Sequence, residues 1–422
     1  MTKPVTKVAL STPRPNPPPY PRRVEPRSIK PRVLFLLKEY PMIGQTYIKN
    51  EIEALEADYE IGILTRRRAK LAYANSRPHC FAIEMEEFVA QVELFKPDVL
   101  HTHYLTELAF TGELSRRTGV PFTVRTHSCD TIGLRRKNLG DRLRQMMRGE
   151  PPAERAAWFT EGLRAMDSEL CLGVLVLPCA RPWMVRTGVN QAKLIDCFPV
   201  VRFAAFHDPS PNGDAVMNIG GAAEKKAMPD FLRLAKKVSG RAFNLYALGA
   251  KTDWLEKQIA GNGARVNVVA PVEPEDMPAE YKKHRWLVYT GDVGTPSAGW
   301  PMAIAEAQAA GVGVCMPMLR PDLAQYIGEG AGILYDTIDE LPAIVSAPVP
   351  EEMRERGFQQ ARKSDIERHK HLLTDLWDDA ICGRTPGYRE QEEAAAETSA
   401  VPAPMPATRR VTGAVTSSAN PA

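Results

Sequence analysis

Short apolar runs alternate with segments of helical spacing along most of this 422-residue sequence, and this alternation restricts the folds that the chain can adopt. Runs rich in β-branched and other apolar residues predict strands at 33–37, 59–64, 99–103, 122–127, 173–177 and 194–198. Helices are predicted between them, among others at 45–56, 85–95, 107–118, 141–147 and 154–166. Strands that alternate with helices form parallel sheets with helices on both faces. The sequence therefore predicts a doubly wound α/β domain.

A second series of the same kind follows residues 207–214, whose prolines, glycine and aspartates are typical of a linker. It predicts strands at 216–219, 243–248, 265–269, 286–289 and 312–316. We therefore expect an N-terminal Rossmann-like domain at 32–206, a linker at 207–214 and a C-terminal Rossmann-like domain at 215–348. Charged helical segments at 349–382 complete the ordered part. In doubly wound sheets ligands bind outside the carboxyl ends of the strands, so we expect a site in the cleft between the domains.

The two ends of the chain differ in composition from the rest. Residues 1–31 include nine prolines, and eight of the first 32 residues are Lys or Arg against one acidic residue, Glu25. This predicts a disordered basic arm, with weak attachment to anionic lipid as the alternative. Basic segments at 66–70 and 135–137 leave peripheral membrane contact open as well. Residues 383–422, rich in Ala, Pro, Thr, Ser and Glu, are expected to form a disordered tail.

Composition also limits the class of protein. No run of 18 apolar residues is present, so we expect no membrane-spanning helix. The seven cysteines include no CxxC pair, which favours reduced thiols and a cytoplasmic location over disulfides or a zinc site. A net charge of +3 without a recognised motif gives no support for a nucleic-acid partner.

Residues 295–311, TPSAGWPMAIAEAQAAG, form the most informative motif. A turn with glycine and proline follows the strand at 286–289 and leads into an Ala-rich helix from about Pro301. Free backbone N–H groups and the positive dipole end make such a helix start a site for phosphate. Its expected ligand-facing residues are Gly299, Trp300, Pro301, Met302 and Glu306. A solvent-facing Glu306, and Trp300 and Met302 that only pack, are the alternatives.

A second candidate motif is MNIGGAAEKKA, at residues 217–227. It predicts a strand that ends at Gly220 and Gly221, followed by a short loop with two lysines before a helix. Glycines allow the backbone to approach a ligand closely, and a lysine there can neutralise a pyrophosphate. A simple turn is the alternative.

Three histidines follow or end predicted strands of the first domain. His101 and His103 are two apart and so share one face of a strand, while His127 ends the next predicted strand. A two-histidine metal site lacks an evident third ligand in the sequence, so we expect no metal. Hydrogen-bonded histidines that shape the cleft are the alternative interpretation. The loop with Gly44, Gln45 and Thr46 follows the first strand and is expected at the same edge.

These segments resemble the retaining glycosyltransferases of the GT-B fold in the large family four (glycosyl transferases group 1). Their donor motif is written E-x7-E, and here Glu306 matches the second glutamate while Ala298 stands at the first. Gly220 and Lys226 match the glycine and lysine of the diphosphate loop, but Gly221 replaces the expected arginine. Thr126 and His127 match the segment Thr-x-His-Gly-x-Asp in part, with Ser128 in place of its glycine.

The resemblance implies a GT-B fold in which the last helices cross back to the first domain. It implies transfer of a sugar from a nucleotide-sugar donor to a glycan or lipid-linked acceptor, with retention and without a bound metal or cofactor, in surface polysaccharide or glycolipid synthesis. Lys226 and the backbone at 299–302 would hold the diphosphate, Glu306 the ribose, and His127 the sugar. The acceptor side would include Gly44, Gln45, Thr46 and His103. Because two motif residues differ, an inactive relative that binds a glycan, a nucleotide or a partner protein stays an alternative.

Overall fold

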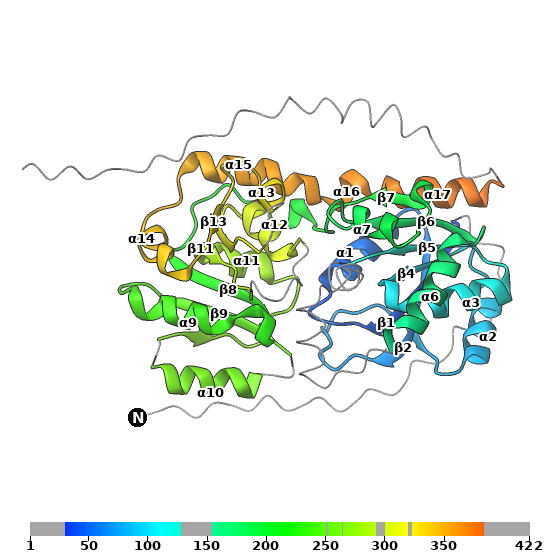
Figure 1. Cartoon of the computed structure of the whole chain (residues 1–422), viewed down its shortest axis with the longest axis horizontal. Helices are drawn as coiled ribbons and strands as arrows, with labels where there is room; N and C mark the ends of the chain where they lie inside the picture. Colours follow the sequence, from blue (N-terminus) through cyan, green and yellow to red (C-terminus); the bar gives the residue numbers. More distant parts are fainter. Residues whose placement is uncertain are drawn as a thin grey trace, which may run out of the picture.

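The computed structural model describes residues 30–127, 154–249, 252–263, 265–292, 300–319 and 323–383. Figure 1 shows two α/β lobes side by side, with the last helices running along one edge of both. The predicted helix at 141–147, nearly all of the predicted arm and nearly all of the predicted tail lie outside the described residues.

The first lobe is built on a parallel sheet with seven described strands in the order β3-β2-β1-β4-β5-β6-β7. The chain reverses its direction of growth between β1 and β4, and such a reversal opens a crevice at the carboxyl edge of a sheet. The strands are β1 (Arg32–Tyr40), β2 (Glu60–Arg68), β3 (Cys80–Phe81), β4 (Val99–His103), β5 (Phe122–Arg125), β6 (Cys171–Val176) and β7 (Leu194–Asp196). The helices beside them include α1 (Thr46–Leu55), α2 (Met85–Phe95), α3 (Leu108–Thr118), α6 (Glu154–Asp167) and α7 (Arg181–Arg186).

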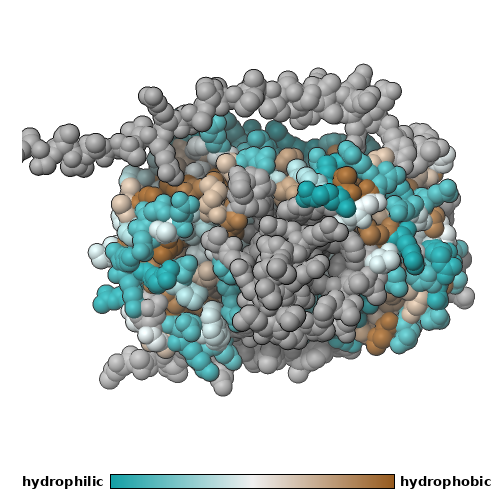
Figure 2. All heavy atoms as spheres, viewed as in Figure 1, coloured by the Kyte–Doolittle hydropathy of each residue, from teal (hydrophilic) through white to brown (hydrophobic). Residues whose placement is uncertain are grey.

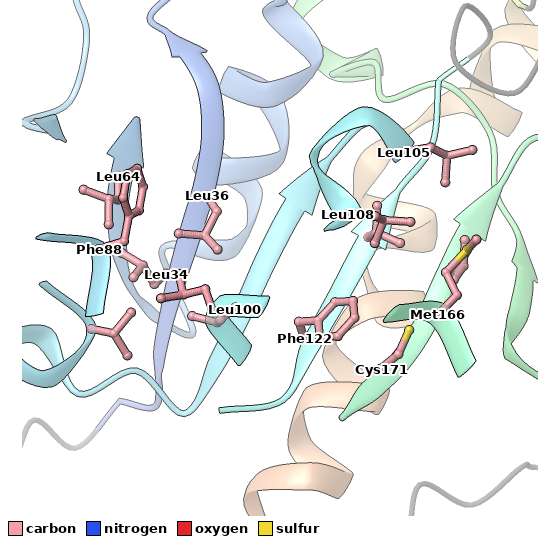
Figure 3. Close-up of a cluster of buried hydrophobic side chains, with 14 of the residues drawn as sticks. Leu34, Leu36, Leu64, Phe88, Leu100, Leu105, Leu108, Phe122, Met166 and Cys171 are labelled. Carbon is pink, nitrogen blue, oxygen red and sulfur yellow. The ribbon is translucent and has the colours of Figure 1, made fainter. Parts of the chain in front are cut away.

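Alternate residues of the first sheet build two separate cores. Leu34 and Leu36 of β1 face the core of α2, α3 and α6, where Phe88, Leu108 and Met166 pack around them (Figure 3). Val33 and Phe35 face the opposite side of the sheet. The strand register places Phe35 beside His101, and His103 beside Arg125. Polar residues of β4 and β5 are therefore held next to one another inside the lobe.

The second lobe repeats this topology with six described strands in the order β10-β9-β8-β11-β12-β13. The strands are β8 (Ala215–Gly221), β9 (Phe243–Leu248), β10 (Asn267–Val268), β11 (His284–Val288), β12 (Gly313–Pro317) and β13 (Ile333–Tyr335). The helices include α9 (Met228–Lys237), α10 (Thr252–Asn262), α11 (Met277–Lys282), α12 (Met302–Ala309), α13 (Leu323–Ile327) and α14 (Leu341–Ser346). Two doubly wound parallel sheets confirm the predicted fold class.

The segment at 207–214 is tied to the second lobe by side-chain donors. Lys282 Nζ donates to the carbonyl oxygens of Asp208 and Ser210, at 3.1 and 2.6 Å. Asn212 Nδ2 donates to the carbonyls of His284 and Ala310, both at 3.1 Å. The segment therefore has the composition of a linker but is held in place by specific hydrogen bonds. The domain boundaries themselves stay predictions.

The last three helices, α15 (Glu351–Ala361), α16 (Ile366–His369) and α17 (His371–Ile381), extend from the second lobe to the first (Figure 1). Trp377 of α17 is fully buried in the first lobe, and its Nε1 donates to Thr123 Oγ1 at 2.9 Å. Tyr59 donates to Asp378 Oδ1 at 2.7 Å. The predicted return of the final helices to the first domain is confirmed.

The described surface is mainly hydrophilic on the face shown in Figure 2, with small scattered hydrophobic areas. Within the described ranges, no helix combines the length and the apolar character needed to cross a bilayer.

Candidate functional site

A cavity of about 530 Å³ lies where the strand-end loops of the two lobes meet. The first lobe contributes the loop after β1 and the residues after β5, and the second contributes the loop after β8 and the start of α12. Both sets follow the carboxyl ends of parallel strands, where doubly wound sheets bind their ligands. The volume is typical of a small-molecule site.

The cavity brings most of the candidate residues together. Its walls include Gly44, Thr46, His127, Gly220, Gly221, Lys226, Trp300, Pro301, Met302 and Glu306. Among the described candidates, Gln45 and His103 lie outside this lining. Gln45 Nε2 donates to the Tyr104 hydroxyl at 3.1 Å, and His103 lies behind His127. Gly299 and Ala298 fall outside the described residues.

Glu306 is a nearly buried carboxyl group in the middle of α12, with 8% of its surface exposed. The hydroxyl of Tyr281, on α11, donates to Glu306 Oε2 at 2.8 Å. Burial raises the pKa of Glu306 to about 7, and the hydrogen bond from Tyr281 opposes this rise. The group is thus placed to accept hydrogen bonds from hydroxyl groups of a ligand. The sequence analysis missed Tyr281, because only the packing of α11 against α12 brings it there.

Gly220 and Gly221 end β8 in an open turn beside Lys226. Gly220 has a φ of +155°, and a Cβ at Gly221 would meet only the Leu248 carbonyl oxygen, at 3.8 Å. The Lys226 ammonium contacts the Tyr289 hydroxyl and lies 4.6 Å from the centre of its ring. Tyr289 follows β11 and also lines the cavity. Among the described residues, a side chain at position 221 would therefore have room to leave the backbone.

His127 is surrounded by aromatic rings from the first lobe. The ring centres of Tyr47 and Tyr104 lie 4.5 and 4.4 Å from its own, and the His103 ring stacks at 5.3 Å. His127 Nε2 is 3.0 Å from His103 Nδ1. Tyr104 has a φ of +75°, a conformation that is costly for a bulky side chain and is often found at functional sites.

Behind His127 lies a fully buried charged cluster, which comprises Glu51, His101, His103 and Arg125. His101 Nε2 and His103 Nε2 are 2.8 and 3.4 Å from Glu51 Oε1. Arg125 Nε contacts the other carboxylate oxygen, Oε2. Burial opposes ionisation of Glu51, but Arg125 and the two histidines outweigh it and hold the pKa of Glu51 well below its usual range. Burial lowers the pKa of His101 to about 4, against the attraction of Glu51.

Glu51 is the third potential metal ligand that the sequence analysis lacked. Its oxygen and the two histidine nitrogens lie within 4.8 Å of one another. The Arg125 guanidinium, however, already balances the Glu51 charge, and its own positive charge disfavours a second cation at this place. A sequence signal was available, because Glu51 shares the apolar face of α1 with Ile48, Ile52 and Leu55.

Comparison with protein families and with curated protein sequences finds no match. Solved structures do match. Anabaena HepE in complex with UDP-glucose has a TM-score of 0.57 at 12% identity, over 87% of this chain and 99% of that one. Sucrose-phosphate synthase from Thermosynechococcus elongatus has a TM-score of 0.59 at 13% identity, over 84% and 100%. A glycosyltransferase from Rickettsia africae has a TM-score of 0.58 at 11% identity, over 84% of this chain and 99% of that one. The likeness extends over nearly the whole of each neighbour, and the chain has the GT-B fold of these glycosyltransferases.

Proposed function

We propose that this chain is a glycosyltransferase that moves a sugar from a nucleoside-diphosphate sugar to a glycan or lipid-linked acceptor, with retention of the anomeric configuration. The observation that carries the proposal is the composition of the cavity, in which a lysine, a helix start, a carboxyl group and a histidine line one space between the lobes. The description of HepE as a complex with UDP-glucose supports a UDP-sugar as the first donor to test.

The second lobe would bind the nucleotide end of the donor. Glu306 accepts hydrogen bonds from the ribose hydroxyls, replacing the bond that Tyr281 now donates. Lys226 and the backbone N–H groups at the start of α12 neutralise the diphosphate, which becomes more negative as the bond to the sugar breaks. Charges fixed in advance at such a place stabilise a transition state without reorganisation. No metal or other cofactor is needed in this scheme.

The first lobe would hold the sugar and the acceptor. His127 contacts the sugar, and the loop with Gly44 and Thr46 forms the acceptor side of the cavity. With a glycan or a lipid-linked glycan as the acceptor, the protein would act in the synthesis of a surface polysaccharide or a glycolipid, at the cytoplasmic side of a membrane.

A non-catalytic protein that binds the same nucleotide is the second candidate. Two sequence observations favour it, namely Ala298 in place of the first motif glutamate and Gly221 in place of arginine. Removal of one charge-stabilising group from an active site commonly costs about 3 kcal/mol of transition-state stabilisation. Arg125 is a second described cation in the cavity wall, but Glu51 balances its charge.

Titration calorimetry with UDP, UDP-glucose, GDP and GDP-mannose tests the donor site. Lys226→Ala and Glu306→Ala are each expected to weaken binding of the preferred nucleotide at least tenfold. Lys225→Ala is the matched control, because Lys225 is the exposed neighbour of Lys226 and does not line the cavity. It should change the affinity less than twofold.

The same samples separate the two candidates. Release of nucleoside diphosphate from the bound donor, with water or a trial glycan as acceptor, supports the enzyme. Micromolar binding of the donor without release of nucleoside diphosphate, whichever acceptor is added, supports the non-catalytic protein. Absence of binding to all four nucleotides contradicts both.

A further inference from the structure

A continuous path of buried polar contacts leads from the last helix to the cavity. It starts on α17, passes through β5, β4 and α1, and ends at the histidine that lines the cavity. Its members in order are Trp377, Thr123, His101, Glu51, His103 and His127. Neither the sequence motifs nor the proposed donor contacts account for this path.

The ionised Glu51 carboxylate, which can only accept, fixes the positions of the protons along the path. An indole N–H can only donate, so Thr123 Oγ1 accepts from Trp377. The Thr123 hydroxyl is then free to donate its own proton to His101 Nδ1, which lies 2.8 Å away. A neutral imidazole carries one proton, so the proton of His101 resides on Nε2, the atom that faces the Glu51 carboxylate.

The same carboxylate fixes the proton of His103. Ionised Glu51 can only accept, so His103 Nε2, 3.4 Å from Glu51 Oε1, carries the proton of that ring. His103 Nδ1 is therefore an acceptor. His127 Nε2 lies 3.0 Å from this Nδ1 and must carry a proton to make the contact favourable.

We propose that Glu51 and His103 are positioning residues that hold His127 as its neutral Nε2–H tautomer, which makes Nδ1 the ring atom that accepts a hydrogen bond from a ligand hydroxyl. The tautomer is argued from the contact between Glu51 and His103 and the contact between His103 and His127. Only the identity of the hydroxyl as one on the donor sugar rests on the proposed function. In this state His127 recognises hydroxyl groups and adds no positive charge for the diphosphate. Charge neutralisation stays with Lys226 and the start of α12.

The electrostatic surroundings agree with a neutral ring. Desolvation, the neighbouring His103 and the Arg125 cation hold the pKa of His127 well below its usual range, against the attraction of Glu51. The aromatic rings of Tyr47 and Tyr104 fix the orientation of the imidazole plane.

A metal ion bound by Glu51, His101 and His103 would favour the opposite tautomer of His127, with its proton on Nδ1. Coordination by His101 and His103 through Nε2 removes the protons from these atoms. The proton of His103 would then reside on Nδ1 and would be donated to His127 Nε2. The two arrangements thus predict different tautomers of His127, and one spectrum distinguishes them.

The test is nitrogen NMR of the full chain with ¹⁵N-labelled histidine, at pH 7 and without ligand. His127 is expected as the Nε2–H tautomer. His103→Phe and His101→Phe form a matched pair, since both side chains are buried, lie on β4 and face the same carboxylate. His103→Phe should reduce the ratio of the two His127 tautomers about tenfold, the effect of one hydrogen bond. His101→Phe should leave the ratio unchanged, because His101 does not contact His127 through a ring nitrogen.

Several results would overturn the inference. These are a His127 that carries its proton on Nδ1, a doubly protonated His127, a stoichiometric metal ion by elemental analysis, or an equal response to both substitutions. If the variants fail to fold, the wild-type spectrum and the metal analysis still decide. The nucleotide titration is independent of this result. If His127 is the Nε2–H tautomer but no nucleotide binds, the inference stands and the proposed function is contradicted. If a nucleotide binds but His127 carries its proton on Nδ1, the proposed function stands and the inference is contradicted.

Discussion

At the scale of single residues, the two described charged groups that the second lobe contributes to the cavity each contact a tyrosine. Tyr281 donates to Glu306, and the Tyr289 hydroxyl contacts Lys226. A buried or half-buried charged group without a partner is costly, so each hydroxyl stabilises the site before a ligand arrives. The hydroxyls fix the positions of the two groups in the cavity wall.

The first prediction concerns the dependence of stability on pH. The pKa of Glu306 is about 7 in the folded protein against an ordinary value of 4.5, so the folded state binds more protons than the unfolded state between these two pH values. Linkage then requires that stability falls as the pH rises through this window. Glu306→Gln removes the titration. Its free energy of unfolding relative to the wild type should increase by about 2–3 kcal/mol between pH 4.5 and pH 8.

Urea unfolding at several pH values across this range measures the effect. Substitution of the exposed Glu329 by glutamine controls for the chemical change itself. A constant difference between Glu306→Gln and the wild type over the whole range would show that the carboxyl group is not desolvated in the free protein.

At the scale of elements, the segment between the lobes is fixed by backbone contacts. The Gly213 N–H donates to the Lys282 carbonyl at 2.8 Å, and a Cβ at this position would lie 2.3 Å from the carbonyl oxygen of Lys283. Glycine is therefore required for close approach of the chain to the end of α11. Together with Asn212 and Lys282, it sets the point from which β8 begins.

The second prediction compares two glycines. Gly213→Ala should destabilise the protein by about 2–3 kcal/mol or more, because the backbone must move to relieve the clash. Gly261→Ala, near the end of α10, has open space around its Cβ and should stabilise slightly, by about 0.5 kcal/mol. Thermal and urea unfolding of both variants measure this. Equal effects would contradict the close approach at Gly213.

At the scale of the whole molecule, the lobes contact each other directly through the loop before α11. Lys49 of α1 forms an ion pair with Glu275 at 3.0 Å, and the Ala74 N–H donates to Glu273 Oε2 at 2.9 Å. These contacts lie beside the cavity and join its two walls. They stabilise the arrangement in which His127 and Glu306 line the same space.

The third prediction concerns this inter-lobe contact. Glu275→Gln removes a partly exposed ion pair, which contributes about 0–1 kcal/mol. The lobes should then separate more readily, and donor affinity should fall by up to about fivefold. Small-angle scattering should show a larger radius of gyration. Asp276→Asn is the control, because it removes an equal charge from the same loop and leaves the ion pair between Lys49 and Glu275 intact. A similar effect of both variants would argue against a specific contact.

The alternation of strands and helices was enough to predict both sheets, because burial on two faces leaves few other architectures. The return of the last helices was predicted from the resemblance to the GT-B glycosyltransferases. Short elements such as α7 and β13 were missed, since segments of this length carry little periodicity. In the site, the motifs indicated Lys226 and Glu306, which line the cavity. The partners Tyr281, Tyr289 and Glu51 were missed, because their proximity depends on how separate helices and strands pack.

The burial of Trp377 and Leu373 in the same core as Val33 and Phe35 has a consequence for how the protein is made. The residues that complete the first lobe are synthesised after the whole of the second lobe. During translation the sheet that emerges first therefore keeps one apolar face only partly covered, by α1, while the entire second lobe follows. A ribosome that stops before α17 would release a chain with both sheets and with exposed apolar side chains of the first sheet, a substrate for chaperones and proteases. Such a dependence couples the survival of the polypeptide to translation through α17.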